Sequence, residues 1–120
     1  KRLGLSDRIA YRFSPEELVP AAGQGILAIQ TRAGEYADLL ARLNSPDGAL
    51  CAKTERQLAS LLGGDCSAPV GCHAQLHGTD MTLYGFSGIG GVSRYGSVQG
   101  NRNDADLLVQ QLASKLTITE

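Results

Sequence analysis

The sequence predicts an α+β fold in which a small three-stranded antiparallel sheet packs against helices, preceded by the tail of an α/β domain. Two stretches, residues 46–62 and 101–116, carry apolar residues at helical spacing. Between them, residues 69–100 hold three runs of alternating side chains, separated by glycine-containing turns. Apolar residues make up 42% of the chain and charged residues 19%, which is enough apolar content for a buried core.

The composition excludes several classes of protein. A formal net charge of -1 and a pI near 6.1 give no basic surface for nucleic acid or an anionic membrane. No run approaches the roughly 20 apolar residues of a membrane span. Three cysteines, an odd number, argue against a disulfide framework and favour a reducing compartment such as the cytosol. Because the sequence opens with Lys1 in the middle of a pattern, we expect a piece of a longer polypeptide.

The first 43 residues contain several short elements. A helix is expected to end at Gly4, before a short strand. Residues 14–25 contain two prolines and form a predicted loop. The compact apolar run ILAIQTR, residues 26–32, predicts a buried strand, and residues 34–44 predict a short helix with one leucine-rich face.

The longest predicted helix begins after Asn44. Ser45 is a good N-cap residue, and Pro46 suits the first helical position. The glycines at 63 and 64 are expected to end the helix. The predicted buried side of this helix consists of Leu50, Thr54, Leu58, Leu61 and Leu62.

Three strands and a final helix follow. The strands are expected in residues 69–78, 81–88 and 92–100, with turns at HGTD and GIGG. The last helix carries two aspartates near its positive N-terminal end. Its predicted inward side chains are Leu107, Leu108, Leu112 and Leu116. Residues 1–43 are therefore interpreted as the incomplete tail of a preceding α/β unit, and residues 44–120 as one α+β domain.

The residue most suggestive of chemistry is Cys66, in the glycine-rich loop between the long helix and the first strand. Loop glycines let the backbone approach a ligand closely. Most free cysteines are small buried filler residues, and that interpretation of Cys66 stays open. The functional alternative is a nucleophilic thiol, which needs access and a thiolate. The neighbouring Asp65 would disfavour the thiolate if the two side chains lie close together.

A metal site is the second possibility for this region. Cys66, Cys72, His73 and His77 form a C-x5-C-H-x3-H pattern, wider than the spacing typical of zinc ligands. In a strand, Cys72 and His73 would also point to opposite faces. No metal ligands are therefore predicted, and Cys72 is expected in the core or on the sheet surface. Cys51 lies in the helix predicted over residues 46–62 and is expected to be a packing residue.

Two further features are weaker signals. The GQG triplet at residues 23–25 is too short for a dinucleotide fingerprint and suits a turn. Arginines at positions 2, 8, 12 and 32 are by default solvated surface charges. Clustered arginines can also bind carboxylate groups through bidentate pairing.

Residues 55–71, ERQLASLLGGDCSAPVG, closely resemble the cofactor-attachment segment of the porphobilinogen deaminase (hydroxymethylbilane synthase) family. The positions that fit are Glu55, Arg56, Leu58, Leu62, Gly64, Cys66, Pro69, Val70 and Gly71. Asp65 replaces a residue that is usually small, and Ala68 one that is usually β-branched. KRLGL, LVPAAGQGILAIQTR and LNSPDGALCAKTERQ resemble further family segments in the same order, with weaker similarity after Gly78.

The resemblance implies a transferase of tetrapyrrole and heme biosynthesis that condenses four porphobilinogen units into hydroxymethylbilane. It implies a dipyrromethane cofactor joined through a thioether to Cys66, and an arginine at position 2 that binds acidic side chains of cofactor or substrate. No catalytic residue is expected among these 120 residues, because the family's catalytic aspartate lies upstream. The implied partners are porphobilinogen and the missing N-terminal domains, in a cytoplasmic, monomeric full-length enzyme.

Two rival interpretations remain at this level. In the first, the chain is a non-enzymatic α+β interaction module whose cysteines are structural. That module would leave Cys66 unmodified. In the second, the chain is a small metal-binding domain that would bind zinc stoichiometrically and lose its structure with a chelator.

Overall fold

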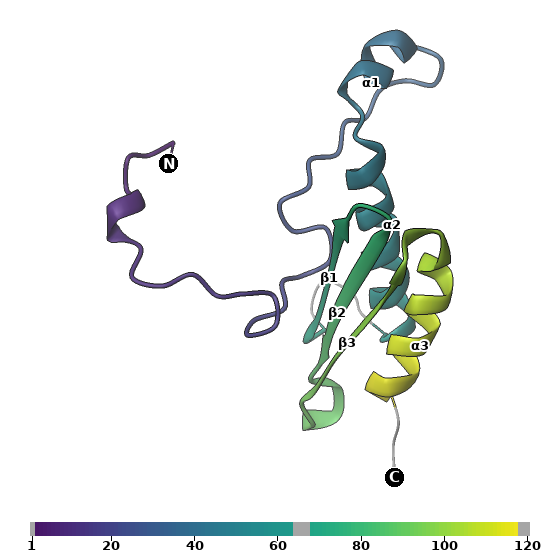
Figure 1. Cartoon of the computed structure of the whole chain (residues 1–120). Helices are drawn as coiled ribbons and strands as arrows, with labels where there is room; N and C mark the ends of the chain where they lie inside the picture. Colours follow the sequence, from purple (N-terminus) through teal and green to yellow (C-terminus); the bar gives the residue numbers. More distant parts are fainter. Residues whose placement is uncertain (1, 64–67, 118–120) are drawn as a thin grey trace.

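The computed structural model describes residues 2–63 and 68–117. A three-stranded antiparallel sheet and three α-helices confirm the predicted α+β class (Figure 1). In chain order the elements are η1 (Ser6–Arg8), α1 (Ala37–Leu43), α2 (Pro46–Leu61), β1 (Val70–His77), β2 (Asp80–Ser87), η2 (Ile89–Gly91), β3 (Arg94–Asn101), η3 (Arg102–Asp104) and α3 (Ala105–Thr117). No helix in the described ranges combines the length and apolarity that crossing a membrane requires.

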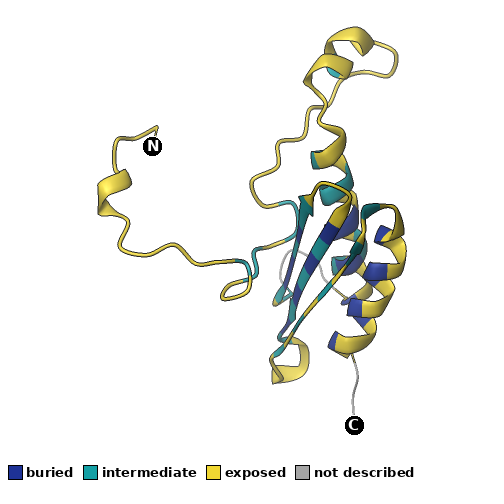
Figure 2. Cartoon of the chain, viewed as in Figure 1, coloured by how far each residue is buried: buried dark blue, intermediate teal, exposed yellow. Residues whose placement is uncertain are grey.

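The sheet has the order β1-β2-β3, with each strand paired to the next along the chain. One face of it packs against α2 and α3, and the buried residues of strands and helices meet there (Figure 2). Glycines on this face let α3 approach closely, since a Cβ on Gly85 would lie 2.5 Å from Leu116 Cδ1. The core consists of Leu58, Leu62, Cys72, Ala74, Met81, Leu83, Ala105, Leu108, Val109, Leu112, Ala113 and Leu116.

The long helix α2 begins as its sequence predicts. The Oγ of Ser45 accepts a hydrogen bond from the N–H of Gly48 (3.1 Å), and Pro46 occupies the first turn. The helix ends before Gly63, whose φ of +80° suits glycine. Leu61 was predicted on the buried side, but it is 47% exposed, so that prediction is wrong.

The same kind of error occurs in α3. Leu107 was predicted to face inward and is 56% exposed, whereas Leu108 is buried. The buried positions follow Leu108 at helical spacing, through Leu112 to Leu116. Leu107 is one position before this buried stripe and therefore faces solvent.

Residues 2–36 contain no strand, so the predicted strands in this part are wrong. Gly4 lies in a turn that leads into η1. The apolar run 26–32 is irregular, with Leu27 93% exposed and Ile29 60% exposed. A strand needs a neighbour to pair its backbone groups, and no described segment pairs with this run. That these residues are the tail of an α/β domain stays a prediction.

Candidate functional site

Cys66 lies outside the described residues, so the structure defines the candidate site by its borders. On one side, α2 ends and Gly63 turns the chain with a positive φ. On the other side, Pro69 leads into β1. The carbonyl of Pro69 accepts a hydrogen bond from the N–H of Gly88 (2.8 Å), which extends the β1–β2 ladder beyond its last pair. The site is therefore bordered by a helix end and a strand start, both anchored in the core domain.

A buried carboxylate lies on the helix that leads to this border. Glu55 is 2% exposed, and its Oε1 accepts the N–H of Gly23 (2.8 Å). Its Oε2 accepts the N–H of Ala74 (2.8 Å) and lies 3.6 Å from Nδ1 of His73. Two hydrogen bonds satisfy a charge that would otherwise be costly to bury. Glu55 thus joins α2, β1 and the GQG turn.

The segment before α1 contacts β1 close to Ala74, the strand residue that Glu55 binds. The carbonyl of Pro20 accepts the N–H of Cys72 (2.8 Å) on the free edge of β1. A Cβ on Gly71 would lie 2.6 Å from the carbonyl oxygen of Val19, so glycine permits this close approach. The GQG triplet forms the predicted turn, with positive φ at both glycines. Val19 and Pro20 therefore lie along β1, and Gly23 is bound to Glu55 of α2.

The sequence motif included Glu55 without predicting its burial or its partners. Glu55, Leu58 and Leu62 share helical spacing, and all three are buried. A glutamate on an otherwise apolar helix face was the signal that could have identified it. Its two partners could not have been identified from spacing, because they lie 32 and 19 residues away in the chain.

The two described cysteines are poor nucleophiles. Cys72 is fully buried on the core face of β1, and burial together with the nearby Glu55 raises the pKa of its thiol to about 12. Cys51 is partly buried in α2, and burial, then Glu55 and Asp47, raise the pKa of its thiol. Cys51 was expected to be a packing residue, and Cys72 was expected in the core or on the sheet surface; Cys72 lies in the core. Neither offers a ready thiolate near neutral pH.

The described residues also bear on a metal centre. Cys72 lies on the core face of β1, and His73 lies on the opposite face, where it stacks with Tyr84 at a centroid distance of 6.3 Å. Within residues 2–63 and 68–117, no three His, Cys, Asp or Glu side chains gather as metal ligands would. The strand geometry thus separates two of the four candidate ligands.

Arg2 is exposed, near the start of a segment that runs away from the sheet (Figure 1). It borders a shallow hollow of about 350 Å³, together with Leu3, Leu5, Ser6 and Ile9. The structure does not bring Arg2 to the border of the Cys66 loop. The other three arginines of the first segment, at positions 8, 12 and 32, are exposed as well.

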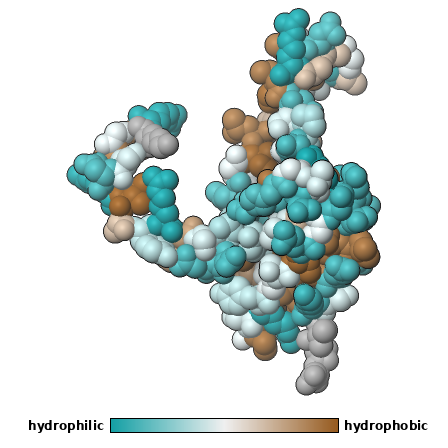
Figure 3. All heavy atoms as spheres, viewed as in Figure 1, coloured by the Kyte–Doolittle hydropathy of each residue, from teal (hydrophilic) through white to brown (hydrophobic). Residues whose placement is uncertain are grey.

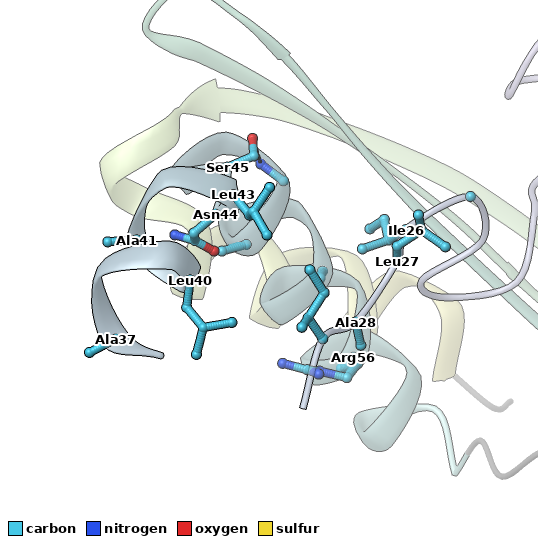
Figure 4. A pocket seen from close by; sticks show the side chains of 15 residues that line it. Ile26, Leu27, Ala28, Ala37, Leu40, Ala41, Leu43, Asn44, Ser45 and Arg56 are labelled. Atoms are coloured by element: carbon cyan, nitrogen blue, oxygen red, sulfur yellow. Dashed lines mark hydrogen bonds between the residues drawn. The ribbon is translucent and has the colours of Figure 1, made fainter. Parts of the chain in front are cut away.

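A larger, mostly apolar hollow of about 850 Å³ lies between residues 25–29, α1 and the first half of α2 (Figure 4). Arg56 supplies its charged group, and the remaining lining side chains are apolar or small and polar. Apolar side chains are also exposed on this side of the molecule (Figure 3). Such a surface can bind apolar groups, and its described lining contains no cysteine, histidine or acidic side chain.

Comparison with known proteins places these features in a family. The family model described as porphobilinogen deaminase, C-terminal domain, matches residues 49–117. The model described as porphobilinogen deaminase, dipyromethane cofactor binding domain, matches residues 1–39. Glu55 therefore belongs to one matched region and its partner Gly23 to the other.

Curated relatives agree over almost the whole chain. Porphobilinogen deaminases from Thiobacillus denitrificans and Chromobacterium violaceum are 42% and 43% identical over 120 residues. The enzyme of the same name from Roseiflexus castenholzii is 39% identical over 119 residues. Each alignment covers 97% of this chain and 39% of the relative, so the chain spans about two fifths of the length of these proteins.

Proposed function

The chain belongs to the porphobilinogen deaminase family, and from that premise we propose that Cys66 anchors its dipyrromethane cofactor through a thioether. The whole protein would be a transferase that builds hydroxymethylbilane from four molecules of porphobilinogen. These 120 residues would carry the anchor, and the catalytic centre would lie in the part of the relatives that precedes the aligned region.

The observation that carries this proposal is the contrast among the three cysteines. Cys72 is fully buried with a thiol pKa of about 12, and the pKa of the Cys51 thiol is also raised. Attachment to either would require an unfavourable thiolate. The motif instead assigns the anchor to Cys66, next to a helix end where Gly63 has a positive φ. The raised pKa values of the Cys51 and Cys72 thiols disfavour these two cysteines, and the family motif supports the third.

The attachment reaction is a substitution at the aminomethyl carbon of porphobilinogen. The sulfur of Cys66 would form a bond to that methylene carbon while the carbon–nitrogen bond breaks, and ammonia would leave with the thiol proton. The free α carbon of the attached pyrrole would then displace ammonia from a second porphobilinogen and give up its own proton, which completes the two-ring cofactor. The bound cofactor would supply the pyrrole carbon to which substrate units are added. The chain's own role would be to present the sulfur among small neighbouring residues, two of them glycines, which leave room in the sequence for a two-ring group.

Arg2 is proposed to bind carboxylate side chains of the cofactor or substrate. A guanidinium pairs with carboxylates in bidentate geometry, and the exposure of Arg2 leaves its donors accessible. The further partners are proposed to be porphobilinogen and the preceding domains of the same protein, in a monomeric enzyme of the cytoplasm. The boundary between residues 1–43 and 44–120 also stays a proposal.

A series of cysteine variants tests the anchor. The suitable protein is a chimera in which this chain follows the preceding part of the Thiobacillus denitrificans relative. Cys66→Ser should yield a folded chimera that gives no pink colour with acidic aldehyde reagent, because serine is a far weaker nucleophile. Cys51→Ser and Cys72→Ser are the matched controls and should keep the colour. Colour in the Cys66→Ser protein, or its loss in Cys72→Ser, would place the anchor elsewhere.

A further inference from the structure

The free edge of β1 is bound by groups from two other segments. The N–H of Cys72 donates to the carbonyl of Pro20 (2.8 Å). Two residues further on, the N–H of Ala74 donates to Oε2 of Glu55 (2.8 Å). The other oxygen of this carboxylate accepts the N–H of Gly23 (2.8 Å). One buried carboxylate therefore joins the edge of the sheet to the GQG turn.

His73 lies between these two edge contacts and brings a titratable ring beside the same carboxylate. Its Nδ1 is 3.6 Å from Oε2 of Glu55, and its side chain is 26% exposed, against 3% for the glutamate. The ring stacks on Tyr84 of β2. At 3.6 Å a neutral imidazole makes no hydrogen bond, whereas a protonated one forms an ion pair with the carboxylate. The attraction between the two side chains therefore depends on the charge of the histidine.

The groups on α2, β1 and β2 around this ring add no second charge to the pair. On β2 the ring meets the phenol of Tyr84, a group that is uncharged near neutral pH. The thiols of Cys51 in α2 and Cys72 in β1 are uncharged there as well, because burial, and then Glu55, raises the pKa of each. The carboxylate of Glu55 is thus the charge to which His73 responds.

Two charged side chains close by in the sequence have other surroundings. Arg56, next to Glu55 in α2, is exposed and lines the apolar hollow (Figure 4). Residues 19–23 contain no titratable side chain, and Glu17 before them binds a tyrosine hydroxyl (2.7 Å). In the part of the chain that the structure describes, no lysine or arginine shares the carboxylate that lies beside His73.

We propose that His73 makes the attachment of the GQG turn to α2 and β1 dependent on pH. Histidine is the side chain that changes its charge between about pH 5 and 8. In acid, the charged ring attracts the carboxylate and holds Glu55 where it binds Gly23, and this stabilisation is lost as pH rises and the ring loses its proton. Gly23 and Glu55 belong to the regions matched by two different family models. The junction between these regions is therefore tighter in acid than at alkaline pH.

Amide hydrogen exchange in the 120-residue chain tests this inference. The protection factor at Gly23, which corrects for the intrinsic effect of pH on exchange, should be roughly two- to fivefold higher at pH 5.5 than at pH 7.5, as expected for a partly exposed ion pair. His73→Phe keeps a ring beside Tyr84 without a charge and should remove this difference. His77→Phe is the matched control, since His77 is an exposed histidine on the same face of β1, and it should keep the difference.

Three further variants separate charge from packing. His73→Gln, which is also uncharged, should behave as His73→Phe does. His73→Arg carries a permanent charge and should give the higher protection factor at both pH values. Glu55→Gln removes the negative partner and should abolish the pH difference. A protection factor at Gly23 that is equal at both pH values in the unsubstituted chain would overturn the inference, as would a difference that persists in His73→Phe and His73→Gln or disappears in His77→Phe.

Discussion

Replacing the buried Glu55 tests how residues 19–23 are held against the sheet and α2. The carboxylate accepts one hydrogen bond from Gly23 and one from Ala74, both 2.8 Å long, and is 2% exposed. A hydrogen bond to a charged group contributes about 1.5–3 kcal/mol. Glu55→Gln keeps one acceptor oxygen and turns an NH2 group toward the other N–H, so it should cost about one such bond.

The expected ranking follows from the number of acceptors lost. Glu55→Gln should lower the free energy of unfolding by about 1.5–3 kcal/mol, and Glu55→Ala, which leaves two N–H groups unpaired, by about 3–5 kcal/mol. Urea denaturation of the 120-residue chain, followed by circular dichroism, measures both. The matched control is Glu16→Gln at an exposed position, where a change within about 0.5 kcal/mol is expected.

The same variant offers a local readout. Amide hydrogen exchange at Gly23 and Ala74 should accelerate in Glu55→Gln, because these are the two N–H groups that the carboxylate binds. If Glu55→Gln were as stable as Glu16→Gln and left both exchange rates unchanged, the hydrogen bonds of Glu55 would not hold this junction together.

Four further outcomes are expected. Residues 44–120 should unfold cooperatively on their own, although less stably than the whole chain, and a non-cooperative transition would refute the boundary. Because the folded-state pKa of Cys72 is raised from 9.0 to about 12, its stabilising contribution is complete below pH 9 and is lost as pH rises toward 12. The urea midpoint should therefore decrease more between pH 8 and pH 10.5 in the unsubstituted chain than in Cys72→Val. In the chimera, Arg2→Ala should raise KM about tenfold or more through one lost charge-assisted contact; unchanged KM and kcat would make Arg2 a surface charge. The 120 residues alone should release no hydroxymethylbilane from porphobilinogen, and measurable turnover would overturn the assignment of roles.

The sheet and its helices were predictable because their signals are local. Each strand pairs with the next one along the chain through a short turn, so alternation between two glycine-containing turns was sufficient to identify it. The start of α2 was equally clear, since Ser45 caps it from within the same turn. Which face of the sheet Cys72 lies on could be settled only with the strand register. Cys72 is paired with Gly85, on the face that the helices cover.

The wrong or missing predictions concern features that depend on interaction partners far away in the chain or outside the described residues. The apolar run 26–32 looked like a buried strand, yet a strand forms only beside another strand, and none is described next to it. Burial of Glu55 depends on N–H groups from two separate segments, which no local pattern encodes. The proposed role of Arg2 involves a ligand, and no local pattern in the sequence encodes a contact with one.

The most direct test of the central claim is the mass of the purified, unsubstituted chimera, combined with peptide mapping. The anchor proposal predicts one added dipyrromethane per chain, located on the peptide that contains Cys66. An unmodified protein that nevertheless makes hydroxymethylbilane, or an adduct on the peptide of Cys51 or Cys72, would contradict it.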